Sequence, residues 1–316
     1  MNNSYSLTIA VLSHNHKDTV KKAIESILSQ QTDYSYELLL FDDASTDGTQ
    51  DILKDYYQQH PEKITLFLFE QSEGPVLRAK QIYEHSSGKY LTWLDGDDYW
   101  TYPQKIQTQL DFLETHPEYN GCFHDASIVS SVDTNENKEL QHQTLKKYKY
   151  YSQFNHYETE FKPYHLIMRN IIPTASLVIR MASFDDFFSR YHFPPYSFSW
   201  AFQLYVIRNS KFYFINECWS VYYDHANGMS KKIAATEFTV NNIRVLKWYK
   251  HDSFYKKFRN NISLSIAREY EMLTYNNGRT RLKYGFLMQY YYFVGWGWIL
   301  CWYLHQVVLT LTGKRK

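Results

Sequence analysis

The 316-residue chain has few cysteines and almost no net charge. Its three cysteines, Cys122, Cys218 and Cys301, lie far apart and do not have metal-ligand spacing. Such a sparse, odd set argues against a disulfide framework and fits a reducing compartment. With a formal charge of +1, the chain also lacks the basic excess that indicates binding to nucleic acid.

The sequence also lacks the motifs of several common nucleotide and hydrolase sites. No Gly-x-Gly-x-x-Gly follows the first apolar run, which argues against a dinucleotide-binding fold. No Gly-x-x-x-x-Gly-Lys-Ser/Thr is present, which excludes a P-loop. Neither a Gly-x-Ser-x-Gly elbow nor a His-Glu-x-x-His zinc helix occurs. The apolar run Leu7–Leu12 is too short for a signal-peptide core and no small-residue cleavage site follows it. We therefore expect the catalytic part to stay in the cytosol.

Aromatic residues are abundant, at 18% of the chain, with 30 Tyr. Sugar-handling and membrane-surface proteins both favour such amphipathic rings, and a tyrosine-rich core explains them equally well. The first third of the chain alternates short apolar runs, at 7–12, 36–41, 64–69 and 90–94, with segments whose apolar residues recur at helical spacing. This alternation predicts an α/β fold with a mostly parallel sheet.

Carboxylates cluster directly after the last of these strands. Tyr90–Leu94 is followed by Asp95, Asp97 and Asp98, with only Gly96 among them. Because open α/β sheets bind ligands at the carboxyl ends of their strands, we expect an active site at this edge, shared with the acidic loop 42–49. Two convergent carboxylates suit a hard divalent ion that also holds a phosphate. A solvated acidic turn is the alternative.

Several co-linear segments of residues 6–123 resemble the nucleotide-binding half of a family-2 glycosyltransferase. They are 13–15, 26–30, 42–49, 88–90, 95–100 and 103–110. The resemblance implies a GT-A fold, with a Rossmann-like, mostly parallel sheet flanked by helices. It implies a nucleotide-sugar-binding half at 1–125 and an acceptor-binding half at 126–230. Apolar residues at helical spacing in 254–266 add a C-terminal helical extension at 231–316.

The same resemblance implies roles for residues that bind the donor. Ser13 and Asn15 belong to its first nucleotide-binding segment. Asp43 would hydrogen-bond the base, with helix capping as its alternative role. Arg78 would contact the diphosphate, although an exposed helix arginine is the simpler interpretation. Asp95 would lie by the ribose and the donor sugar.

The resemblance further implies a metal ion. Asp97 would bind Mn²⁺ or Mg²⁺ across the diphosphate, where the ion stabilises the departing nucleoside diphosphate. His225, which follows a late strand, would approach the ion or the diphosphate. A surface histidine is the alternative for this position.

One part of the pattern departs from the family. Ser199 stands where inverting members have the aspartate that deprotonates the acceptor hydroxyl, and Tyr223 replaces an expected arginine. A serine hydroxyl does not ionise near neutral pH, so it does not take that proton unaided. Either Asp125, Asp185 or Asp186 serves as the base, or the alignment slips, or turnover is impaired.

The C-terminal stretch 286–311 carries no formal charge except that of His305. A helix of this length could cross about 30 Å of hydrocarbon, but basic residues flank both ends and polar residues interrupt it. We favour an in-plane helix at an anionic membrane surface over packed helices or a true span.

The sequence thus predicts a metal-dependent, inverting glycosyltransferase that takes a UDP-sugar or related nucleoside diphosphate sugar. We expect its acceptor to be a hydroxyl of a surface or lipid-linked glycan, and its place to be cytoplasmic, peripheral to the membrane. The alternatives are a sugar-nucleotide-binding partner protein at the membrane with impaired catalysis and, more weakly, a nucleotidyltransferase.

Overall fold

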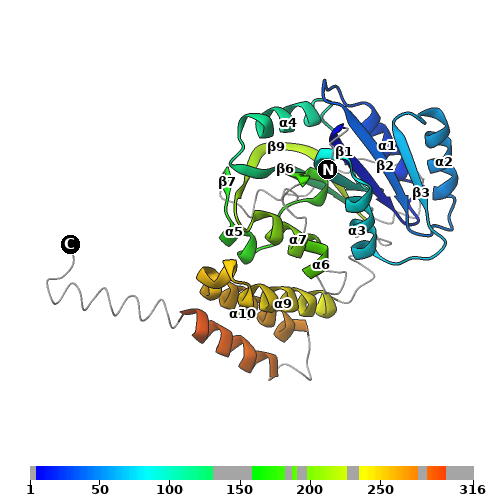
Figure 1. The fold of residues 1–316 in the computed structure, drawn as a ribbon. Coiled ribbons are helices and arrows are strands. Elements are labelled where there is room, and N and C mark those ends of the chain that lie inside the picture. The colour runs from blue at the N-terminus through cyan, green and yellow to red at the C-terminus, as the bar shows by residue number, and fades with distance from the viewer. Residues whose placement is uncertain are drawn as a thin grey trace. The chain divides into compact units, whose positions relative to one another are not determined.

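The structure is a computed structural model (Figure 1) that describes residues 5–130, 159–181, 187–190, 198–225, 235–276 and 283–296. It divides the chain into two compact units. The first contains Met1–Lys162, Ile171–Tyr191 and Tyr205–Lys231, and the second contains Pro163–Asn170, His192–Leu204 and Lys232–Lys316. The predicted division into halves at 125 and 230 concerns function rather than compactness, and it stays a prediction.

The first unit begins with four parallel strands joined by helices. The strands are β1 (Tyr5–Ser13), β2 (Tyr36–Asp42), β3 (Ile64–Leu68) and β4 (Gly88–Asp95), and the helices between them are α1 (Val20–Leu28), α2 (Thr49–Gln59) and α3 (Pro75–His85). They lie in the order β3-β2-β1-β4. Each of the three pairings is parallel, so the predicted α/β class with a largely parallel sheet is confirmed.

The sheet continues beyond β4 with strands of both directions. These are β5 (Tyr99–Trp100), β6 (Tyr119–Ser130), β7 (Glu160–Phe161), β8 (Val178–Arg180) and β9 (Lys211–Asp224). The order β4-β8-β6-β9-β5 completes one sheet of nine strands among the described residues, with β7 also paired to β9. β9 runs parallel to β6 but antiparallel to β5 and β7.

Helices cover both faces of the sheet, since its strands are apolar on both sides. Alternate residues of β1, such as Leu7 and Ile9, belong to one buried cluster with residues of α1, α2 and α4 (Lys105–Thr115). Phe41 belongs to the other face, where it stacks on Phe67 at 4.4 Å and lies near His85 of α3. Burial on two sides explains why β1 and β2 read as continuous apolar runs.

The second unit is helical, which confirms the predicted C-terminal helical extension. Its elements include α5 (Pro163–Met168), the start of α7 (Phe198–Ile207), α9 (Ala235–His251), the short η5 (Phe254–Phe258), α10 (Arg259–Asn276) and a helix at 283–296. Two buried tyrosines tie α9 and η5 to α7: Tyr249 donates to the carbonyl of Ala201 and Tyr255 to that of Leu204, both at 2.6 Å.

Among the helices described here, none combines the length and the hydropathy that a membrane crossing requires. The helix at 283–296 covers only the first part of the stretch 286–311, and 297–311 lies outside the described residues. Asp185 and Asp186 lie outside them as well.

Candidate functional site

Three parallel strands deliver their loops to one edge of the first unit. In the register of the sheet, Ser13 lies beside Asp42 and Leu12 beside Asp95, so β1, β2 and β4 end together. The sequence predicted that the loops after Asp42 and Asp95 share this edge. The structure brings them together there with the loop that follows β1.

The loop after β1 is held by the loop after β2. The hydroxyl of Ser13 donates to Asp42 at 3.0 Å. Asn15 has a left-handed backbone (φ 57°), and its N–H donates to the hydroxyl of Ser45 while its side-chain oxygen accepts from the N–H of Thr46, both at 2.8 Å. Non-glycine residues in this conformation carry strain that the surrounding contacts maintain, and such residues concentrate at functional sites.

Asp43 lies at the end of β2 and is nearly buried. Its carboxylate accepts from the hydroxyl of Ser72 at 2.5 Å, from Nε of Arg78 at 2.6 Å, and from the N–H groups of Glu73 and Gly74. Burial alone would raise the pKa of Asp43, but the hydrogen bonds from Ser72 and Arg78 hold it below its usual value. The side chain is therefore a fixed carboxylate that orders the segment leading into α3.

Arg78 is fully buried, so it is not the exposed helix arginine that the sequence left open. Besides its bond to Asp43, its guanidinium donates to Glu73, Gln81 and the carbonyl of Gln71 at 2.6–3.0 Å. Its donors are used within the chain, and its nearest charge partner is the carboxylate of Asp43.

The turn after β4 gathers three carboxylates, with ligand oxygens of Asp95, Asp97 and Asp98 within 4.8 Å of one another. Burial and the neighbouring Asp97 raise the pKa of Asp95 to about 7. Burial likewise raises the pKa of Asp98 well above its usual value, with Asp97 and Asp95 adding to the effect. Crowded carboxylates of this kind are relieved by a bound cation, which favours their charged forms.

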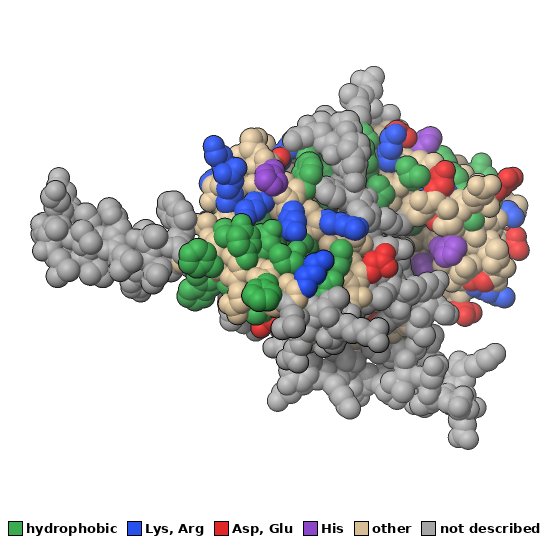
Figure 2. Space-filling model, turned by 90° about the horizontal axis from the view of Figure 1, so that it is seen from below, with side chains coloured by type: hydrophobic (Ala, Val, Ile, Leu, Met, Phe, Trp, Pro, Cys, Tyr) green, Lys and Arg blue, Asp and Glu red, His purple; other side chains and the backbone are tan. Residues whose placement is uncertain are grey.

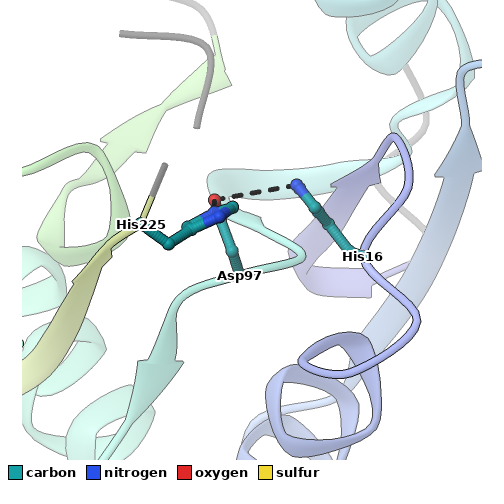
Figure 3. A group of neighbouring side chains, drawn as sticks. All are labelled: His16, Asp97 and His225. Carbon is teal, nitrogen blue, oxygen red and sulfur yellow. Dashed lines mark hydrogen bonds and ion pairs between the residues drawn. The ribbon is translucent and has the colours of Figure 1, made fainter. Parts of the chain in front are cut away.

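β9, which lies far along the chain from this turn, brings His225 beside Asp97 (Figure 3). β9 pairs with β5 so that Tyr99 lies opposite Val221, and the N–H of Tyr223 donates to Asp98 at 3.1 Å. The same pairing brings Nε2 of His225 to 2.9 Å from Oδ2 of Asp97. The sequence assigned both residues to the metal, and the structure brings them into contact although they lie 128 positions apart in the chain.

His16 is a residue of this site that the sequence reasoning missed. Its Nε2 lies 3.6 Å from Oδ2 of Asp97, and the ligand atoms of His16, Asp97 and His225 lie within 4.8 Å of one another. Burial lowers the pKa of His16 against the opposite influence of Asp97. His14 and His16 are separated by one residue in the polar loop after β1, and this His-x-His pattern beside the expected edge of the sheet is the signal that could have indicated it. This set of carboxylates and imidazoles fits a divalent cation.

Of the three aspartates considered for the catalytic base, Asp125 is the one that the structure describes. Asp125 lies within β6 opposite Cys218, is nearly buried, and accepts from the N–H of Ala126 at 2.9 Å. Ser199 is the second residue of α7 and belongs to the other unit. The identity of the base therefore stays a prediction.

Comparison with solved structures confirms the GT-A fold. Residues 1–349 of S. aureus TarS in complex with UDP-GlcNAc align with a TM-score of 0.63 at 15% identity, covering 84% of this chain and 72% of that one. The mannosyltransferase PcManGT from Pyrobaculum calidifontis, in complex with GDP-Man and Mn²⁺, aligns with a TM-score of 0.55 at 14% identity, covering 98% and 88%.

Comparison with curated proteins gives relatives that include named glycosyltransferases. An uncharacterized protein of Mycobacterium tuberculosis is 29% identical over 181 residues, 57% of this chain and 49% of the relative. The Escherichia coli UDP-Glc:alpha-D-GlcNAc-diphosphoundecaprenol beta-1,3-glucosyltransferase WfaP is 28% identical over 145 residues, 45% of this chain and 56% of the relative. The chain thus spans about half the length of these relatives.

The family described as glycosyl transferase family 2 matches residues 8–183, more than half of the chain. Motifs, fold and sequence agree, and the chain belongs to glycosyl transferase family 2.

Proposed function

We propose that this protein transfers a sugar from a nucleoside diphosphate sugar to a hydroxyl acceptor, with inversion, using Mn²⁺ or Mg²⁺. The observation that carries the proposal is the meeting of Asp97 with His225 at the edge where β1, β2 and β4 end. A UDP-sugar is the donor that we favour, because TarS binds UDP-GlcNAc and WfaP is named for UDP-Glc.

In this proposal the turn after β4 holds the metal and the donor. Asp97 and His225 would hold the ion, which when bound would supply Lewis-acid stabilisation of the departing nucleoside diphosphate. Asp95 lies on the donor side of the turn, where a carboxyl with a pKa of about 7 changes its charge readily when a cation arrives. Asp98 fixes the turn to β9 through the N–H of Tyr223.

We propose that Asp43 accepts a hydrogen bond from the nucleobase of the donor and that Arg78 positions Asp43. The carboxylate of Asp43 already accepts four hydrogen bonds from its own chain, the longest at 3.3 Å from the N–H of Gly74. A base N–H would replace this weakest bond, while the 2.6 Å contact with Arg78 keeps the carboxylate charged and oriented. Direct contact of Arg78 with the diphosphate would require it to leave these partners.

The base for the acceptor is Asp125, Asp185 or Asp186 in this proposal, because Ser199 does not take a proton near neutral pH. Loss of the usual carboxylate at Ser199 also supports a second candidate function, a sugar-nucleotide-binding protein with impaired turnover. The two candidates differ in whether product forms, and they share the binding site.

The acceptor in our proposal is a lipid-linked or surface glycan reached from the cytoplasmic face of the membrane. WfaP is named for a diphosphoundecaprenol acceptor. The helix at 283–296 supports a membrane-proximal location: Phe286, Tyr290, Phe293 and Trp296 are 58–78% exposed and follow one another at three- or four-residue intervals. At that spacing the four rings share one face of the helix.

The rest of this helix is attached to its own unit. Tyr292 donates to Glu271 at 2.9 Å, Tyr291 stacks near Tyr270, and a Cβ on Gly295 would meet Leu264 at 2.6 Å. The described residues from 235 onward carry eight Lys and Arg against four Asp and Glu. Figure 2 shows hydrophobic side chains gathered beside Lys and Arg side chains on one face. An aromatic face with basic neighbours suits the interface of an anionic bilayer, with the helix lying in its plane.

Thermal unfolding with a panel of nucleotide sugars, each with and without Mn²⁺, tests the donor part. A ligand at a hundred times its dissociation constant stabilises the folded state by about 2.7 kcal/mol. We expect one nucleotide sugar to stabilise the protein in a Mn²⁺-dependent way and Asp97→Asn to abolish that dependence. Product formation on lipid-linked acceptors supports the transferase, whereas binding without any turnover supports the partner protein. No stabilisation by any nucleotide sugar contradicts both.

A further inference from the structure

We propose that His16 is a third protein ligand of the divalent ion, beside Asp97 and His225, and that it makes the site prefer Mn²⁺ and later transition metals over Mg²⁺. This inference rests on the proposed function, since it concerns the ion of the same site. It adds His16, from the loop after β1, to which the sequence assigned no role.

The distances suit coordination of one ion by three side chains. His16 and His225 approach the same oxygen of Asp97, at 3.6 and 2.9 Å, and the three ligand atoms lie within 4.8 Å of one another. Ligands that each lie about 2.1 Å from an ion are about 3 to 4 Å apart. Small side-chain movements would therefore bring the three ligand atoms within coordination distance of one ion.

The position of His16 is not explained by a hydrogen bond. Its Nε2 lies 3.6 Å from Oδ2 of Asp97, beyond the 2.7–3.2 Å that is typical of an N–H···O hydrogen bond. Its Nδ1 is buried and has no hydrogen-bond partner in the part of the chain that the structure describes. The imidazole thus directs Nε2 towards the carboxylate of Asp97 without a hydrogen bond to it, as a ligand would before the ion arrives.

The backbone around His16 is arranged to hold the ring there. The residue before it, Asn15, is kept in its strained conformation by the loop after β2, and the N–H of His16 donates to Thr49 at 2.9 Å. Across the site, Gly96 leaves room for the ring, because a Cβ at this position would lie 2.7 Å from Nδ1. The turn between Asp95 and Asp97 thus admits the imidazole only while residue 96 is glycine.

Two imidazoles and one carboxylate determine which ions the site favours. Imidazole nitrogen suits transition metals, whereas Mg²⁺ prefers a shell of oxygen ligands. Affinity for such a donor set rises from Mn²⁺ towards Co²⁺ and Ni²⁺. We therefore expect Mg²⁺ to compete poorly with Mn²⁺ even when it is in large excess.

The test measures Mn²⁺ binding to the full chain without nucleotide, by calorimetry and by the nitrogen modulation in the pulsed EPR spectrum of bound Mn²⁺. Replacing residues that merely support metal ligands costs roughly 10- to 100-fold in affinity, so His16→Ala, which removes a ligand, should cost at least about tenfold. It should also remove one of two imidazole signals and lower the ratio of Mn²⁺ to Mg²⁺ affinity. His251→Ala, an exposed histidine at the end of α9, is the matched control and should bind Mn²⁺ as the wild type does.

A second variant keeps the ligand but moves it. Gly96→Ala should displace the ring of His16, so that Mn²⁺ binds more weakly and one imidazole signal decreases. His225 should keep its contact with Asp97. If His16→Ala keeps both imidazole signals and the wild-type ratio of Mn²⁺ to Mg²⁺ affinity, His16 is not a ligand. If instead Asp97→Asn and His225→Ala also bind Mn²⁺ normally, the metal part of the proposed function fails as well, so the two failures are distinguishable.

Discussion

The carboxyl of Asp95 should make the metal-free protein less stable than its asparagine variant at alkaline pH. Its pKa is raised from 3.8 to about 7, mainly by burial and further by Asp97. The folded state therefore holds the proton more tightly than the unfolded state. The stability that the neutral carboxyl contributes is fully present below the unfolded pKa of 3.8 and is lost as pH rises through about 7.

The size of this effect follows from the shift. At about 1.36 kcal/mol for each pKa unit, the raised pKa lowers the stability of the fold by about 4 kcal/mol near pH 8, where the carboxyl is charged in both states, and by about 2 kcal/mol near pH 5, where only the unfolded carboxyl is charged. Asp95→Asn is neutral and similar in shape, so it should stabilise the metal-free protein by up to these amounts. The gain should grow by roughly 2 to 3 kcal/mol between the two pH values.

Urea unfolding in a chelator, followed by tryptophan fluorescence at the two pH values, measures this gain. Asp33→Asn, which changes an exposed carboxylate, is the control and should shift stability by less than about 0.5 kcal/mol. Saturating Mn²⁺ should reverse the order, because the ion stabilises the charged wild-type cluster and not the amide. A gain that does not depend on pH, or a loss of stability near pH 8 without metal, would refute the reasoning.

Other changes test the rest of the molecule. Arg78→Ala should lower the free energy of unfolding by about 3–5 kcal/mol, since it leaves a buried carboxylate without its partner, and urea titration measures this. Lys105→Met should raise stability most below pH 7, by up to about 4–5 kcal/mol, because burial lowers the pKa of Lys105 from 10.5 to about 7. The wild-type lysine is neutral in the fold above that pKa, so the advantage of methionine should fade as pH rises towards 10.5. Replacing Phe286 and Phe293 together with Ser should lower sedimentation with anionic vesicles by at least about tenfold, whereas Tyr57→Ser, on an exposed ring of α2, should not. Equal binding by all three proteins would contradict the membrane proposal.

The nucleotide-binding half was predictable because its signals are local. Apolar runs and helical spacing placed the strands, and parallel strands necessarily present their carboxyl ends together, which brought Asp42 and Asp95 to one edge. The cluster after β4 was visible as three acids within four residues. These features need no knowledge of distant contacts.

The completion of the site was not predictable from local pattern. The contact of His225 with Asp97 depends on the pairing of β9 with β5, two strands far apart in sequence, and β9 also has irregular register against β6. Family resemblance, rather than periodicity, pointed to His225. Arg78 read as a surface residue because a single arginine in a polar helix gives no sign that Asp43 will bury it.

The pairing of β9 with three different strands, β5, β6 and β7, has a mechanical consequence. Its last residues cannot peel away from β5 without withdrawing His225 from Asp97 and breaking the bond to Asp98. If the proposed ion binds Asp97 and His225, it can leave only when this border of the sheet opens, so loading with a cation should slow amide exchange at Val221 and Tyr223 together.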